Sequence, residues 1–269
     1  MHATDDLIPY NQNAIDNLLN KLENFYIDNG LAVPVSPSEF ANSETTKNIS
    51  SYLDGFIIPQ DKKAFYLGIN SKSDIENKYN YLYSKLEDLK NDIDDYSISN
   101  KESLSEDMYS KMKKFKMAVE KVLSPLQSRQ KKLLKACDNE CNSIDEMQER
   151  AGDTYENLLK EKLFPTIIPP LYDGLKNSNN SSYKWLLKKI NTFFSEIGIY
   201  TVPLNVGDIL SDDDIVYYQL QPKDDESDIT SDATLNCAVR EIEYYAYRLS
   251  EDGDPRIVME GKVNLWRIK

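Results

Sequence analysis

The chain has 269 residues with 40% hydrophobic content, and its formal net charge is -13 with a sequence pI near 4.7. The hydrophobic content can build a folded core, yet no apolar run approaches the ~18 residues of a membrane span, so we expect no membrane segment. The acidic balance repels phosphate backbones and therefore argues against nucleic acid as a partner.

Cysteine usage and the N-terminal residues both favour the cytoplasm. The chain has three cysteines, so at least one has no partner within it, and a disulfide framework is not expected. Residues 1–9 lack the basic-then-apolar plan of a secretory signal. We therefore predict a cytoplasmic protein.

Changes of residue pattern divide the chain into an N-terminal helix with an irregular segment (1–72), a helical stalk (73–162), a short helix pair (163–199) and a β domain (200–269). In the first segment, apolar spacings of four and three predict an amphipathic helix over 15–25. The predicted fold class is α+β, with long coiled-coil-type helices, a short helical bundle and a small C-terminal β domain.

Apolar residues at the start of the stalk recur at alternating spacings of four and three, which is typical of a helix that packs along a seam. These residues are Ile75, Tyr79, Leu82, Leu86, Leu89, Ile93 and Tyr96. Ser73, with Glu76 three residues later, predicts a capping box at the start of this helix. A polar stretch over 97–103 leaves two possibilities open, a continuous helix or a restart capped at Ser103.

A second apolar stripe extends over 102–162, where Pro125 predicts either a kink or a restart of the helix. Unbroken, these ~60 residues would form a rod of roughly 90 Å. The apolar edge of such a rod must be covered by another helix. The cover could come from a second copy of the chain or from 75–96 folded back as a hairpin, and the sequence does not choose between them.

Prolines then predict the end of the rod, at Pro165, Pro169 and Pro170. A helix is expected over 183–197, closed by Gly198. Runs rich in Val, Ile and Tyr follow and predict strands. These runs are 200–204, 215–220, 233–249 and 256–266.

The sequence has few combinations of residues that could catalyse a reaction or bind a metal, so an enzyme is not expected. The single histidine is His2, and the chain has no Gly-x-x-x-x-Gly-Lys phosphate loop. Cys137 and Cys141 share one helical face, but zinc needs four ligands, so we interpret them as small seam residues. The acidic runs 212–214 and 224–226 lack the spacing of a calcium loop, and we predict neither a metal nor another cofactor.

The basic run within 111–135 is interleaved with apolar residues at helical spacing. We interpret it as a solvated helix face beside a packed stripe.

Several short stretches in the second half of the chain carry a resemblance to a known family. Residues 168–175 read Ile-Pro-Pro-Leu-Tyr-Asp-Gly-Leu, 194–199 read Phe-Ser-Glu-Ile-Gly-Ile, and 246–249 read Ala-Tyr-Arg-Leu. In this order, after a long heptad helix, they resemble the GrpE family, the nucleotide exchange factors of DnaK-type chaperones. The chain differs after Gly207, where the family's histidine is missing.

The resemblance implies a homodimer whose β domain binds a DnaK-type chaperone ATPase and promotes its release of ADP, with no bond made or broken by the exchange factor. By position, the chaperone would be contacted by Arg256, Leu265 and Tyr247. The dimeric bundle would include Pro170, Asp173, Leu175, Leu186 and Phe194. The alternative interpretation is a coiled-coil scaffold or adaptor without exchange activity.

Overall fold

The computed structural model describes residues 55–141, 143–177, 181–220, 229–230, 233–250 and 256–268. The helix expected over 15–25 lies outside these residues. The described chain is α+β, as predicted, and it divides into two compact units. The helical unit contains Gly55–Pro203 and Tyr244–Gly261, and the described part of the β unit lies within Leu204–Glu243 and Lys262–Lys269.

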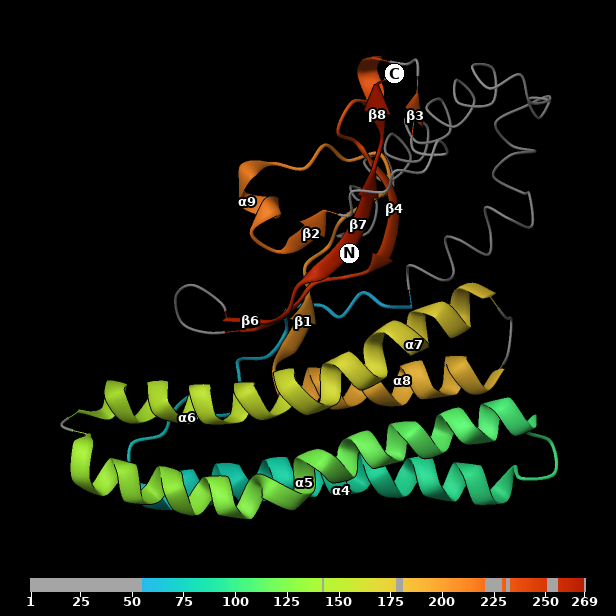
Figure 1. Cartoon of the computed structure of the whole chain (residues 1–269). Helices are drawn as coiled ribbons and strands as arrows, with labels where there is room; N and C mark the ends of the chain where they lie inside the picture. Colours follow the sequence, from blue (N-terminus) through green and yellow to red (C-terminus); the bar gives the residue numbers. More distant parts are fainter. Residues whose placement is uncertain are drawn as a thin grey trace, which may run out of the picture. The chain divides into compact units, whose positions relative to one another are not determined.

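The helical unit is built from helices that pack side by side along the chain's own apolar stripes (Figure 1). Helix α4 contacts α5 and α8, α5 contacts α6 and α7, and α7 contacts α8. The bounds are α4 Lys72–Ser99, α5 Glu106–Glu140, α6 Ile144–Leu158, α7 Phe164–Asn177 and α8 Ser181–Glu196. A π-helical segment, Leu159–Leu163, joins α6 to α7.

Of the two covers considered for the second apolar stripe, a second copy or 75–96 folded back as a hairpin, the structure adopts the hairpin for α5. In the first stripe, Ile75, Leu82, Leu86, Leu89 and Ile93 are all buried, and α4 packs against α5 of the same chain. The polar stretch after Ser97 does end the helix. A second helix then begins, with Ser105 rather than Ser103 as its N-cap.

Residues 102–162 do not form one unbroken rod, a question that the sequence left open, because the chain turns back between Glu140 and Ile144. Cys141 has an extended backbone, and the Ser143 hydroxyl accepts a hydrogen bond from the Glu146 amide, which caps the new helix. Of the two possibilities at Pro125, a kink or a restart, the restart does not occur, since α5 continues through that residue. Buried residues on both sides of Pro125, Val122 and Leu126, keep the helix packed despite the missing amide.

The prolines expected to end the rod instead lie inside α7. Sequence spacing explains why the helix persists: Tyr155, Leu159, Leu163, Ile167 and Leu171 recur every four residues, and all are fully buried. A spacing of four drifts around a regular helix of 3.6 residues per turn, and the wider π turn counters that drift. Burial of this row therefore holds α6 and α7 together as one run.

A small antiparallel sheet completes the helical unit. It consists of β1 Ile199–Thr201, β5 Tyr247–Leu249 and β6 Arg256–Met259, in the order β1-β5-β6. Ile199 pairs with Leu249, and Leu249 pairs in turn with Arg256. The helical unit thus combines the predicted stalk and helix pair with residues 55–72 of the predicted N-terminal segment and with 200–203 and 244–261 of the predicted β domain, so its limits do not follow the predicted segments.

The β unit contains a second small sheet and short helical turns. The sheet order is β2-β7-β4, formed by Tyr218–Leu220, Gly261–Leu265 and Val239–Tyr244. Strand β3 (Ile229–Thr230) pairs in parallel with β8 (Arg267–Ile268), and α9 spans Asp212–Ile215. The predicted strand at 215–220 is therefore half helix and turn, because the Ser211 cap continues into α9 before β2 begins.

No helix within the described residues combines the length and apolar character that crossing a membrane requires.

Candidate functional site

The β unit exposes large apolar side chains within one short segment, 209–220. The exposed fractions are 64% for Ile209, 48% for Ile215, 60% for Val216 and 44% for Leu220. These four side chains are called the apolar surface of the β unit. Ile215 lies in α9, Val216 follows it, and Leu220 ends β2. Figure 1 shows α9 and β2 following one another in the chain. Ile215 and Val216 are adjacent in the chain, and neighbouring exposed apolar side chains are typical of a surface that binds another protein.

Hydrogen bonds fix the backbone that carries this surface. The Ser211 hydroxyl accepts from the Asp214 amide at 3.2 Å, and the Asp214 carboxylate accepts from the Ser211 amide at 3.0 Å. This reciprocal pair is a capping box, which satisfies both ends of the first turn of α9. Before it, the Gly207 amide donates to the Val239 carbonyl at 2.7 Å, and the Val239 amide donates to Asp208 at 2.8 Å. Ile215 and Val216 are therefore held outward by a turn anchored to β4.

Leu265, one of the predicted chaperone contacts, lies in the β unit on strand β7. Its side chain is half-buried, and β7 is the neighbour of β2, the strand that ends at Leu220. Leu265 and Leu220 thus lie on neighbouring strands of the same sheet.

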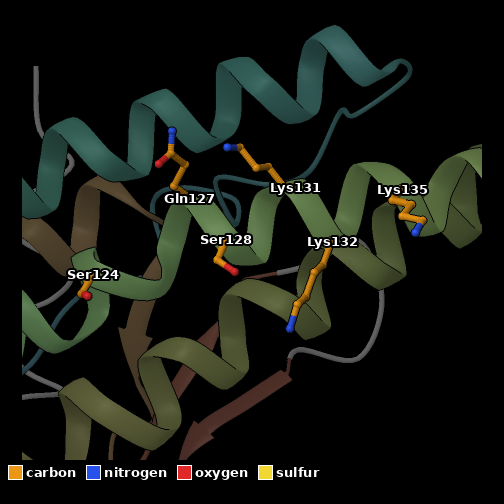
Figure 2. Close-up of a pocket in the computed structure, with 6 residues that line it drawn as sticks. All are labelled: Ser124, Gln127, Ser128, Lys131, Lys132 and Lys135. Carbon is orange, nitrogen blue, oxygen red and sulfur yellow. The ribbon is translucent and has the colours of Figure 1, made fainter.

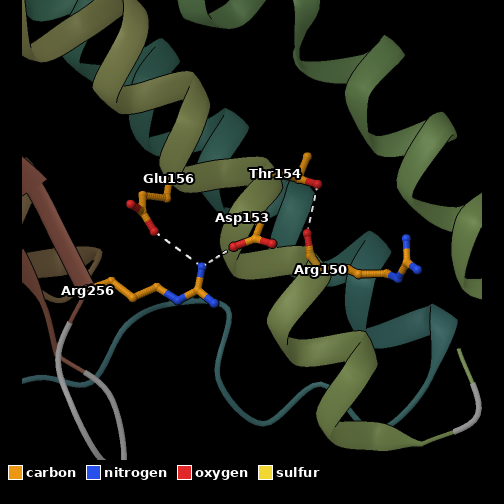
Figure 3. Close-up of polar contacts among 5 residues, drawn as sticks. All are labelled: Arg150, Asp153, Thr154, Glu156 and Arg256. Atoms are coloured by element: carbon orange, nitrogen blue, oxygen red, sulfur yellow. Dashed lines mark hydrogen bonds and ion pairs between the residues drawn. The ribbon is translucent and has the colours of Figure 1, made fainter.

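Arg256 lies instead in the helical unit, where its guanidinium fastens β6 to α6. It donates to the carboxylates of Asp153 and Glu156, the second at 3.3 Å (Figure 3). Burial raises the pKa of the Glu156 carboxyl, and the hydrogen bond from Arg256 opposes that rise. The charge predicted to meet a chaperone therefore has acidic partners within its own chain.

Tyr247 is a core residue, which corrects the prediction that it contacts a partner. Its side chain has 0% exposure, and its ring packs edge-on against Phe164 and Phe194. Its hydroxyl lies 3.2 Å from that of Tyr172. Burial also raises the pKa of the Tyr247 hydroxyl. A side chain without exposed surface cannot touch another protein while this core is intact.

The residues predicted for the bundle lie on two helices that contact each other, α7 and α8. Leu186 and Phe194 on α8 are fully buried, and the Phe194 ring stacks on Phe164 at 4.7 Å. On α7, Pro170 and Leu175 are half-buried, and Asp173 is exposed. Leu186 and Phe194 therefore belong to the core of a single chain, and the predicted role of all five residues between two chains stays a prediction.

Two kinds of reactive group are a cysteine thiol and a cluster of metal ligands. Burial and the neighbouring Cys141 raise the pKa of the Cys137 thiol to about 11, so it stays protonated near neutral pH and is a poor nucleophile. Within the described ranges, no group of three or more His, Cys, Asp or Glu side chains is placed to hold a metal ion. His2 lies outside these ranges.

Sequence reasoning missed the apolar surface because it compared 212–214 with a calcium loop and assigned 215–220 to a strand. A signal was present: the apolar pairs Ile209-Leu210 and Ile215-Val216 flank the acidic run. Only the short capped helix α9 separates these two pairs, so the chain between them is too short to bury both pairs in the core.

Comparison with known proteins adds no relative, since no protein-family model, curated protein or solved structure matches this chain.

Proposed function

We propose that this chain is a non-enzymatic cytoplasmic protein that binds another protein through the apolar surface of the β unit. The observation that carries the proposal is the exposure of Ile209, Ile215, Val216 and Leu220 on a hydrogen-bonded turn. Exposed apolar area costs solubility unless a partner covers it, and covering it contributes about 25 cal/mol per Å² of apolar surface.

For the identity of the partner, we propose a DnaK-type chaperone ATPase, whose ADP release the chain would promote as a homodimer. The support is the order of the GrpE-like stretches, together with Leu265 lying in the same sheet as Leu220 of the apolar surface. An exchange factor needs no catalytic group. It needs only to bind the open, ADP-releasing conformation of the ATPase more tightly than the closed one.

The test is a stopped-flow measurement of fluorescent ADP release from a DnaK-type ATPase of the same organism. At saturating protein, the native chain should accelerate release by about tenfold or more, in the range of typical coupling between two sites. Val216→Asp should lose most of this acceleration, because it places a charge where the partner would cover an apolar side chain.

Ile98→Asp is the matched control, because Ile98 is 66% exposed on α4 of the helical unit. This variant should accelerate ADP release as the native chain does. Equal losses in the two variants would reject the apolar surface as the binding site. A release rate that the native chain leaves unchanged would reject exchange activity altogether.

The second candidate is a scaffold or adaptor without exchange activity. A specific observation favours it: Tyr247 and Arg256, two of the residues that the resemblance assigns to chaperone contact, are engaged inside the helical unit. Pull-down of the ATPase without faster ADP release would support the adaptor. Failure of both binding and release would assign the apolar surface to a different protein partner.

A further inference from the structure

Helix α5 carries a concentrated positive charge on a strongly acidic chain. Between 121 and 135 the chain has basic residues and no acidic ones, whereas the whole chain has a net charge of -13. The basic residues are Lys121, Arg129, Lys131, Lys132 and Lys135, and all are exposed. We call them the basic face of α5.

These side chains form no ion pair with any described residue, unlike other lysines of the helical unit. Lys116 pairs with Asp94 at 2.7 Å, Lys189 with Asp92 at 2.7 Å, and Lys85 with Glu196 at 3.0 Å. The fold therefore neutralises lysines where the bundle brings acidic side chains within reach. The basic face of α5 is left outside that arrangement.

Like charges also repel one another along this face. Lys131 and Lys135 are four residues apart, and Lys132 lies three residues from both Arg129 and Lys135. Such pairs are neighbours on a helix and destabilise it when no opposite charge intervenes. An acidic ligand would remove this repulsion, so the free face is poised to bind one.

The surface here is hollowed rather than flat. Ser124, Gln127 and Ser128, together with Lys131, Lys132 and Lys135, line a shallow hollow of about 450 Å³. Figure 2 shows the Lys131 and Lys132 side chains diverging from adjacent positions of α5, with Ser128 one turn before them. Small hydroxyl side chains between ammonium groups give carboxylates both charge and hydrogen-bond donors.

We propose that the basic face of α5 binds an acidic peptide segment of a partner protein, extended along the helix. The face from Lys121 to Lys135 is about 21 Å long at the helical rise of 1.5 Å per residue, which matches about six residues of extended peptide. Glu120 lies before the face and Asp138 after it. A longer polyanion would meet the Glu120 carboxylate at one end, whereas Asp138 at the other end is ion-paired with Lys72. A short acidic segment that stops before Glu120 therefore fits better than a nucleic acid strand.

The test uses fluorescein-labelled octaglutamate and the full chain, followed by fluorescence anisotropy at low salt. The triple variant K131Q/K132Q/K135Q should bind about tenfold more weakly, because three exposed charge contacts are lost. The control variant K101Q/K184Q/K188Q removes the same charge from exposed lysines elsewhere in the helical unit, and its affinity should stay within about twofold of native. Circular dichroism checks that both variants are folded.

Three results would overturn the proposal: no octaglutamate binding by the native chain, equal weakening in both triple variants, or tighter binding of labelled oligo-dT or phosphatidylserine vesicles. The last result would assign the face to nucleic acid or to a membrane surface. The outcome is separate from the exchange assay, because Val216→Asp lies in the β unit and should leave octaglutamate binding unchanged.

Discussion

At the scale of single residues, two glycines distinguish the effect of backbone strain alone from that of strain combined with a steric clash. Gly68 and Gly198 have the same left-handed φ of 78°. A Cβ at Gly68 would meet nothing within 4 Å, whereas one at Gly198 would lie 2.2 Å from the Lys63 carbonyl oxygen and 2.6 Å from the Ala64 amide nitrogen. Backbone atoms cannot rotate away as a side chain can, so only the second site combines both penalties.

We therefore predict that Gly68→Ala lowers the free energy of unfolding by about 1 kcal/mol, the cost of a left-handed L-residue. Gly198→Ala should lower it by roughly 3 kcal/mol or more, because the Lys63 and Ala64 backbone must also move. Urea unfolding followed by circular dichroism measures both. Equal losses in the two variants would contradict the close approach at Gly198.

The sequence predicted part of what Gly198 does. Its position after an apolar helix indicated a helix end, and α8 does end at Glu196. The approach of Lys63 could not be predicted, because it joins residues far apart in the chain. The same limit explains Tyr247, whose burial depends on Phe164 and Phe194 from two helices.

At the scale of elements, the sequence predicted that helices exist more reliably than where they begin. Ser73 with Glu76 and Ser71 with Asp74 both satisfy the spacing of a capping box. The structure uses the earlier pair: the Ser71 hydroxyl accepts from the Asp74 amide at 3.2 Å, and the Asp74 carboxylate accepts from the Asn70 amide at 2.9 Å. Local spacing alone cannot rank two overlapping boxes.

Ser71→Ala should therefore lower the free energy of unfolding by about 1 kcal/mol, the usual cost of losing an N-cap, and Ser73→Ala should change it little.

Hydrogen bonds, first that from the Asn70 amide, lower the pKa of Asp74. Because its pKa is lowered in the folded state, Asp74 stabilises the fold above its unfolded pKa. This stabilisation is lost as the pH falls through the folded pKa. Chemical unfolding at neutral and acidic pH tests both statements, and a larger loss for Ser73→Ala would restore the sequence-based cap.

The joined helices α6 and α7 show the opposite case, in which a local rule was overridden. Pro165, Pro169 and Pro170 predicted an interruption, since each removes an amide donor. The buried row from Tyr155 to Leu171 gains more from packing than these missing hydrogen bonds cost. Proline marks a weakened helix, and tertiary contacts decide whether the helix ends.

At the scale of the whole molecule, the heptad spacing predicted that a stripe of apolar side chains is buried, but not which helix packs against it. A heptad stripe needs a neighbouring helix, and a second copy meets that need as well as a hairpin does. In the structure, α5 covers α4 within one chain, so the helical unit does not need a second copy for this purpose. A homodimer, if formed, would use a different surface from the stripe on α4.

Leu86 provides the test of this arrangement, because it lies mid-stripe on α4 with 0% exposure. Leu86→Ala should lower the free energy of unfolding by about 3 kcal/mol through the cavity it leaves. Ile98→Ala, at a side chain 66% exposed on the same helix, should cost far less. An intrachain contact makes the Leu86 loss independent of protein concentration, whereas a contact between copies would couple folding to association. Unfolding curves at about 1 and about 50 μM protein distinguish these cases, and a loss that changes with concentration would return the stripe to the dimer interface.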